Sequence, residues 1–254
     1  MAALRVVLIS YPVAAVFLGV LAVSAGGHVS SGAVIWGVLC GISQAFGVWW
    51  FYAAMAAGPM SVVSPLTAIL VAGVPLAVGF AQGERPGLSA CIGVVVALVA
   101  VLLVSVQVTD EDSIPHRFTA KVAWLTVGSG LAFGLNFVLI HQAPVDAHLW
   151  PLVFGRLSAT AVVVVAALLT RNFVAPRGDS LKLALFAAVL DTTANVAMLY
   201  ALQGAMLSLA SVLISLYPAA TVALALVVLK ERVTRWQAVG MALALASVAL
   251  IAAG

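Results

Sequence analysis

The chain has 254 residues, of which 65% are hydrophobic and only 7% are charged. A soluble domain has about a quarter charged residues, so an ordinary globular protein and a disordered chain are both excluded. The 11 Lys and Arg residues against 8 Asp and Glu give a net charge of +3, but no basic cluster is dense enough to bind nucleic acid. The mean hydropathy of +1.23 indicates a polytopic membrane protein whose surface is covered mostly by lipid.

The apolar runs are long enough to cross a bilayer as helices and do not alternate as barrel strands do. Helices also satisfy their own backbone groups in lipid. We therefore predict an all-α polytopic membrane protein. Polar or Gly/Pro-rich breaks divide it into nine transmembrane helices, at 4–24, 33–55, 60–81, 87–107, 119–141, 148–170, 181–201, 205–229 and 235–253.

The first span resembles a signal peptide, since Arg5 precedes an apolar run that ends at Val23-Ser24-Ala25. A cleavable signal has an apolar core of about 7–15 residues, and this run is longer. We therefore expect a membrane helix here.

Four sequence signals recur in the same order at an offset of 147 or 148 residues. They are Tyr52-Ala53 with Tyr200-Ala201, the serine-bearing segments 61–66 and 208–213, Glu84-Arg85 with Glu231-Arg232, and Gly93 with Gly240. We predict a first repeat at 1–108, a linker at 109–118 and a second repeat at 119–254. The second repeat has five helices and the first has four, because helix 119–141 has no counterpart upstream.

The second half resembles the EamA family of the drug/metabolite transporter superfamily. The similarity lies in Leu199-Tyr200-Ala201-Leu202, Ser215-Leu216-Tyr217-Pro218 and Leu229-Lys230-Glu231-Arg232. The resemblance implies a ten-helix inverted-repeat bundle that moves small metabolites, amino acids or drugs, with export common in the family. The chain departs from it in lacking the first helix, which indicates either a misassigned start or a nine-helix variant. It also has Val71 where the second half has Pro218.

What the resemblance implies about partners is a small-molecule substrate and a lipid bilayer. Protons are a candidate coupling ion because one carboxylate, Asp191, falls inside a predicted span. No cofactor, metal or nucleic acid is expected. The implied location is a multi-pass position in the cell membrane. The sequence leaves the oligomeric state open.

Basic residues are distributed unevenly between the two ends of the predicted helices, and the positive-inside rule uses this bias. Of the basic residues at helix ends, only Arg85 lies on the membrane side opposite the N-terminus. The side of the N-terminus has Arg5, Arg117, Lys121, Arg171, Arg177, Lys182, Lys230, Arg232 and Arg235. We predict a cytoplasmic N-terminus and an extracytoplasmic C-terminus, although the resemblance implies a cytoplasmic C-terminus.

Two charged residues fall inside predicted spans, where charge is costly and therefore indicates a functional site. Arg156 lies about 12 Å, and Asp191 about 15 Å, below the same membrane side, so adjacent helices are able to bring them together. Three interpretations stay open: a structural ion pair, a substrate or proton site that uses Asp191, and an Arg156 that reaches the lipid edge beside a protonated Asp191. As the single midplane carboxylate, Asp191 is the proton-coupling candidate.

Further polar side chains at similar depth predict a substrate pocket at the repeat interface. Asn195 lies four positions after Asp191 on one helical face. Asn136 is equally consistent with a lining group and with a hydrogen bond that joins two helices. The substrate-binding candidates are Asp191, Asn195, Arg156, Gln44, Tyr52, Asn136 and Tyr200.

Other polar residues receive structural interpretations. Glu84 and Glu231 stand in turns beside Arg85 and Arg232, which is typical of solvated charge pairs at helix ends. Pro218 and Pro75 predict kinks that free backbone carbonyls.

An enzyme is the weaker alternative. The pair His141 and Asp146 has the His-x4-Asp spacing of some membrane acyltransferases, but no phosphate-binding block accompanies it. No nucleophile elbow, P-loop or zinc-protease motif is present. We predict that the chain is not an enzyme. A third hypothesis is an inactive or partner-dependent bundle, because one helix is missing.

Overall fold

The computed structural model describes residues 2–105, 118–169, 179–230 and 234–253, and leaves out the side chains of 2–8, 61, 179–180 and 229. Several features of the sequence analysis lie outside the described part. They are the linker except for Phe118, the Arg5 and Ser61 side chains, Arg117, Arg171, Arg177, Glu231 and Arg232.

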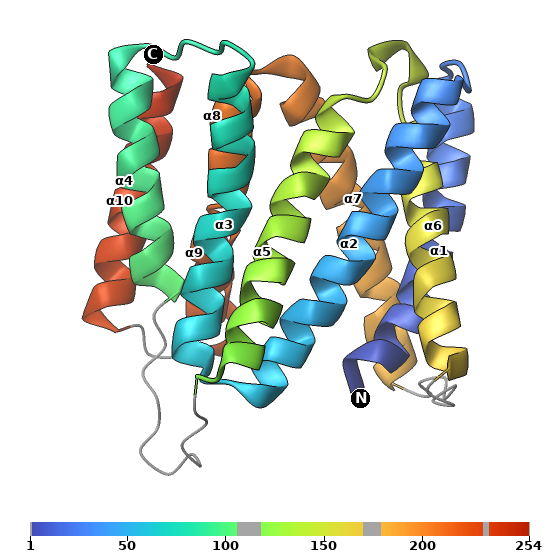
Figure 1. Ribbon diagram of the computed structural model, residues 1–254, viewed down its shortest axis with the longest axis horizontal. Coiled ribbons are helices and arrows are strands. Elements are labelled where there is room, and N and C mark those ends of the chain that lie inside the picture. Colours follow the sequence, from blue (N-terminus) through green and yellow to red (C-terminus); the bar gives the residue numbers. More distant parts are fainter. Residues whose placement is uncertain (1, 106–117, 170–178, 231–233, 254) are drawn as a thin grey trace. The chain divides into compact units, whose positions relative to one another are not determined.

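The described residues form helices and no strand, which confirms the all-α prediction. Eight helices are long and apolar enough to cross a membrane, and Ile9–Ala25 adds a shorter apolar helix. The helices are shown in Figure 1. Their bounds are α1 (Ala2–Ala25), α2 (Ser31–Ala57), α3 (Met60–Ala81), α4 (Leu88–Ser105), α5 (Ala120–His141), α6 (Trp150–Leu169), α7 (Asp179–Gly204), α8 (Leu207–Ile214), α9 (Tyr217–Leu224) and α10 (Arg235–Ala252), with a 3-10 turn at Val145–Ala147 and a π-helix at Ala225–Leu229.

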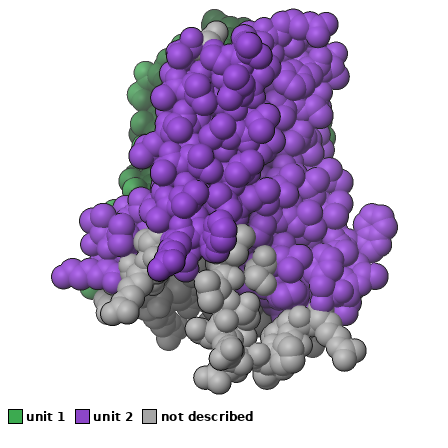
Figure 2. Space-filling view, turned by 90° about the vertical axis from the view of Figure 1, so that its left-hand side faces the viewer, with its two compact units in different colours: residues 1–46, 136–204 green, residues 47–135, 205–254 purple. Residues whose placement is uncertain are grey.

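The chain divides into two compact units, which Figure 2 colours separately. Unit 1 comprises Met1–Phe46 and Asn136–Gly204, and unit 2 comprises Gly47–Leu135 and Ala205–Gly254. Each unit therefore takes helices from both predicted repeats, and α2 and α5 contribute to both units. The division into repeats itself stays a prediction.

In unit 2, α4 and α10 pack side by side (Figure 1). Their bounds differ by 147 at both ends, as 235 less 88 and 252 less 105. A Cβ added to Gly93 would meet Ile251, and one added to Gly240 would meet Val104. Gly240 is the repeat counterpart of Gly93, and Ile251 is the counterpart of Val104, each at an offset of 147 residues. The two contacts are therefore the same contact with the roles of the two helices exchanged. Two repeat-related helices that contact each other in this way are antiparallel and related by a local twofold axis, as inverted repeats require.

The Glu84 side chain, at the α3–α4 turn, differs from the predicted solvated pair. Its two carboxylate oxygens accept hydrogen bonds from the backbone N–H groups of Leu207 at 2.6 Å and Ser208 at 2.9 Å. The residue at the N-cap position, Met206, supplies no side-chain cap. A carboxylate at a helix N-terminus is stabilised by the free N–H groups and by the helix dipole. Glu84 therefore caps α8 from a distant part of the chain.

The span predicted at 205–229 is interrupted. The α-helix α8 ends at Ile214, α9 begins at Tyr217, and a π-helix follows at Ala225–Leu229. Pro218 has no N–H to bond the carbonyl of Ile214, which explains a break at this place. The equivalent helix α3 has Val71 at the repeat position of Pro218 and runs without a break, although it contains Pro65 and Pro75. The helix is therefore interrupted at Pro218, as predicted, and is not interrupted at Pro75.

In unit 1, α1 packs against α6 and α7. A Cβ on Gly41 would overlap the carbonyl of Gly155, so the backbones of α2 and α6 approach as closely as glycine permits. The Ser158 hydroxyl on α6 donates a hydrogen bond to the backbone carbonyl of Val38 on α2 at 3.0 Å, which joins the same two helices. This close packing holds α6, which carries Arg156, in a fixed position.

Candidate functional site

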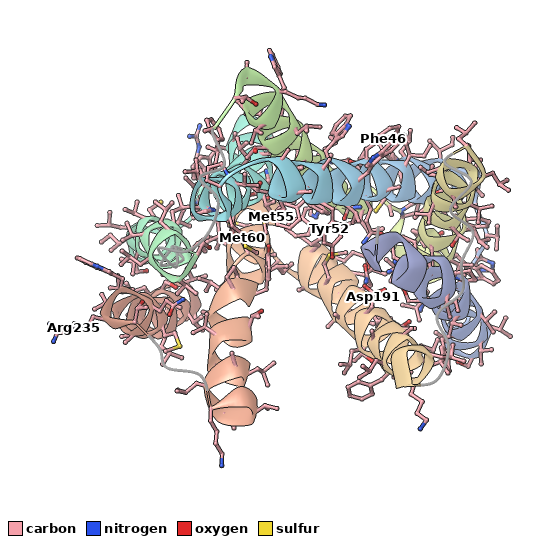
Figure 3. The ribbon with its side chains drawn as sticks, turned by 90° about the horizontal axis from the view of Figure 1, so that it is seen from below. Phe46, Tyr52, Met55, Met60, Asp191 and Arg235 are labelled. Carbon is pink, nitrogen blue, oxygen red and sulfur yellow. The ribbon has the colours of Figure 1, made fainter. Side chains whose placement is uncertain are left out.

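The two charges predicted inside the membrane form an ion pair in unit 1. Nη2 of Arg156 on α6 donates to Oδ2 of Asp191 on α7 at 2.5 Å. Asp191 is labelled near the middle of α7 in Figure 3. It lies about 20 Å along α7 from the Gly204 end, at 1.5 Å per residue. The depth argument from the sequence therefore brought the correct two residues together.

The two partners differ in burial. The Arg156 side chain is 2% exposed, whereas the Asp191 side chain is 40% exposed. Cζ of Arg156 lies over the ring of Tyr11 on α1, 4.6 Å from the ring centroid. This is the distance at which a cation is attracted to an aromatic face. Asp191 is thus the accessible member of the pair, and Arg156 lies behind it.

Arg156 is only partly satisfied. Its second terminal nitrogen, Nη1, is buried and has no hydrogen-bond partner among the described residues. A guanidinium carries five donors in a planar fork, and a carboxylate placed squarely in front of it accepts from two nitrogens at once. Asp191 engages one of the two terminal nitrogens.

Asn195 holds the carboxylate from the same helix. Its Nδ2 donates to Oδ1 of Asp191 at 3.1 Å and to the Asp191 backbone carbonyl at 2.7 Å. Each oxygen of the carboxylate therefore has its own donor, Asn195 on Oδ1 and Arg156 on Oδ2. The spacing of four residues predicted this shared face.

Asn136 on α5 makes a different contact. Its Nδ2 donates to the backbone carbonyl of Cys40 at 2.8 Å and lies 2.9 Å from the Cys40 sulfur, and both residues are buried. Of the two predicted roles, this geometry favours the hydrogen bond that joins helices. A role in lining a substrate route stays a prediction.

The contacts of the described residues do not connect the remaining candidates to the ion pair. Gln44 on α2 is half-buried in unit 1. Tyr200 lies nine positions after Asp191, which is about half a turn around α7 from it, and its side chain is exposed. Tyr52, labelled on α2 in Figure 3, is exposed and belongs to unit 2. Their part in binding stays a prediction.

Of the two residues of the enzyme alternative, His141 has a partner in the fold. Nδ1 of His141 lies 2.7 Å from the backbone carbonyl of Leu202, so this nitrogen carries a proton and donates it. Asp146 is exposed in the short α5–α6 connection. The described residues contain no group of three or more His, Cys, Asp or Glu side chains able to hold a metal ion.

Neither the contact of Tyr11 with Arg156 nor the cap formed by Glu84 was predicted from the sequence. A tyrosine inside an apolar run next to Pro12 was the available signal for Tyr11. The partner of Glu84 lies more than 120 residues away, and no local pattern indicates it.

These features together define a polytopic helical membrane protein with a polar site inside its spans. Residues 120–253 match the model of the EamA-like transporter family, so the chain belongs to that family, within the drug/metabolite transporter superfamily. Among solved structures, 21 chains match. One, titled "Crystal structure of protein", has a TM-score of 0.75 and 15% identity over 98% of this chain and 86% of that chain, which shows the fold alone. No curated protein matches.

Proposed function

We propose that the chain is a secondary transporter that moves small metabolites or drugs across a membrane by alternating access, and that Arg156 and Asp191 form its substrate and coupling site. Membership of a transporter family supports the general activity. The single observation that carries the site is the ion pair in the middle of α6 and α7, with a buried cation and a partly exposed carboxylate.

Energetic cost is the main argument for this site. A charged side chain in the centre of a bilayer is disfavoured by about 3 kcal/mol or more, so ionisable residues there face a water-filled route or a partner. The Arg156 charge is covered by the protein, but 40% of the Asp191 side chain is not. A packed apolar pair would stabilise the same two helices without this cost. The pair is therefore kept for its chemistry, with the exposed part of Asp191 on the solute route.

Asp191 is the proposed proton-coupling residue, because a carboxylate that exchanges a partner for a proton is able to link solute movement to a pH gradient. Asn195 orients the carboxylate from one side. Gln44, Tyr52, Asn136 and Tyr200 are proposed as further contacts along the route, in conformations that differ from this one where necessary.

The test is transport by the full chain in lipid vesicles under an imposed pH gradient. The probes are a panel of radiolabelled amino acids, short-chain carboxylates and amine drugs. Wild-type vesicles are expected to move at least one probe in a gradient-dependent manner, and Asp191→Asn is expected to lose that dependence. Asp146→Asn, the same chemical change at an exposed loop position, is the matched control. An unchanged gradient response in Asp191→Asn overturns the coupling role.

Direction, membrane and orientation complete the proposal. We propose export across the cell membrane, as the family resemblance implies. The basic residues at one set of helix ends predict a cytoplasmic N-terminus. The test is a C-terminal fusion to a reporter enzyme that works only in the cytoplasm. Activity of this fusion would contradict the proposed orientation.

A further inference from the structure

The buried charge of Arg156 requires an anionic partner in this fold. Arginine stays protonated at any physiological pH, and the Arg156 side chain is 2% exposed. A buried charge that loses its partner is strongly disfavoured. An anion must therefore stand in front of this guanidinium in every state that the protein occupies for long. In the state described here that anion is Asp191.

The contact with Asp191 does not satisfy all the N–H donors of the Arg156 guanidinium. The bond from Nη2 to Asp191 uses one terminal nitrogen, while Nη1 is buried without a partner among the described residues. Cζ of Arg156 lies over the Tyr11 ring, and the N–H donors of a guanidinium lie in its own plane, where a carboxylate accepts from them. A carboxylate free of the α7 backbone is able to accept from both terminal nitrogens.

We propose that the substrate class is a small solute that carries a carboxylate, and that its carboxylate replaces Asp191 on Arg156 while Asp191 takes up one proton. This inference rests on the proposed function and names the chemistry of its site. The exchange keeps the net charge of the site constant. Arg156 and Asp191 begin as a neutral pair, and Arg156 with the bound anion beside a protonated Asp191 is neutral again.

The same requirement for a constant net charge at the site disfavours a cationic solute. A cation bound to Asp191 would lie next to an arginine that has lost its partner, and two like charges would share a buried site. Anion binding, in contrast, is linked to proton binding, so each must strengthen the other by the same factor.

Among the described residues, Tyr11 on α1 and Cys40 on α2 interact with Arg156 in addition to its partner Asp191 on α7. Asp191 is the one carboxylate among them. The proton that accompanies the anion is therefore assigned to Asp191.

Binding to the purified full-length protein tests the exchange. The probes are sodium benzoate and sodium acetate, with tetramethylammonium as the cationic comparison, measured by calorimetry between pH 5 and pH 8. In the wild type, the apparent Kd for benzoate is expected to rise about tenfold per pH unit where Asp191 is ionised, with about one proton taken up per anion. Asp191→Asn is expected to bind benzoate with a Kd that changes less than about twofold over this range.

Two variants keep the result interpretable. Asp146→Asn should behave as the wild type. The double variant Asp191→Asn with Arg156→Gln, which has no charge at the site, should bind neither anion and also reports any non-specific effect of salt. Anion binding that is equal in the double variant and in Asp191→Asn overturns the proposal, as does a folded Asp191→Asn that binds neither anion.

Failure of this inference is distinguishable from failure of the proposed function. If tetramethylammonium binds in competition with protons and the carboxylates do not, the substrate class is wrong while Asp191 remains the coupling residue. If vesicles of the wild type and of Asp191→Asn also respond identically to the pH gradient, the proposed site itself is wrong.

Discussion

The two compact units are stabilised by different kinds of contact. Unit 2 packs glycine against apolar side chains in a local twofold arrangement, and its long-range cap by Glu84 lies at the end of a helix. Unit 1 places an arginine and an aspartate in the middle of two spans. Close glycine packing occurs in both units, but only unit 1 adds a charged pair at mid-span among the described residues.

The difference shows where folding and function are separated. Contacts in unit 2 lower the free energy of the folded state at little desolvation cost, since they involve van der Waals packing and a terminal cap. The ion pair in unit 1 has a large desolvation cost and a modest net gain. A residue pair that stability alone does not favour is the better place to look for activity. Four substitutions sharpen this comparison.

The largest effect is expected for Asp191→Asn, measured by unfolding in mixed micelles without added carboxylate. This change leaves the Arg156 charge buried without an anion, and we expect the free energy of unfolding to fall by about 3 kcal/mol. Arg156→Met should cost less, about 1 kcal/mol, because the partly exposed Asp191 is able to take a proton. A larger loss for Arg156→Met than for Asp191→Asn would contradict the buried-cation argument.

The second substitution tests the twofold packing of unit 2. A Cβ at either glycine would lie 2.7 Å from a side chain, that of Val104 at Gly240 and that of Ile251 at Gly93. The backbone is closer at Gly240, where the Val104 nitrogen lies at 2.9 Å, than at Gly93, where the Ile251 nitrogen lies at 3.1 Å. Side chains move more easily than backbone, so Gly240→Ala should cost about 2 kcal/mol and Gly93→Ala less. Ile251→Ala should partly rescue Gly93→Ala and should not rescue Gly240→Ala. Equal rescue of both by Ile251→Ala would contradict the assigned contacts.

The third substitution removes the cap on α8. Glu84→Gln replaces a carboxylate that accepts from two N–H groups by an amide with a single acceptor oxygen, and we expect a loss of about 1 kcal/mol. Arg85→Gln, its neighbour in the same turn, is the control and should change stability by less than about 0.5 kcal/mol. Equal effects from both substitutions would contradict the cap and support the solvated charge pair that the sequence predicted.

Much of this fold follows from the sequence because lipid restricts the possibilities. The span predicted at 60–81 matches α3, and the span at 205–229 contains α8, α9 and the π-helix. The similar depth of Arg156 and Asp191 made their pairing one of the interpretations that the sequence left open, and the two side chains form an ion pair.

The contacts that were missed are decided by tertiary packing. Tyr11 reaches Arg156 because α1 packs against α6. Glu84 reaches α8 because the α3–α4 turn lies at the start of that helix. Both are single side chains whose partners are set by three-dimensional approach, and no periodicity or spacing in the chain reports that approach.

The smallest expected effect separates the two interpretations of Asn136. Asn136→Ala removes the bond to the Cys40 carbonyl, and interhelical hydrogen bonds in membranes contribute about 0.6 kcal/mol on average. If Asn136 only joins α5 to α2, stability should fall by that amount and benzoate affinity should stay within about twofold of the wild type. Thr193→Ala, at an exposed position of α7, is the control. A benzoate Kd raised tenfold with unchanged stability would instead place Asn136 on the solute route, and unit 1 would then use a buried amide as well as its charges for binding.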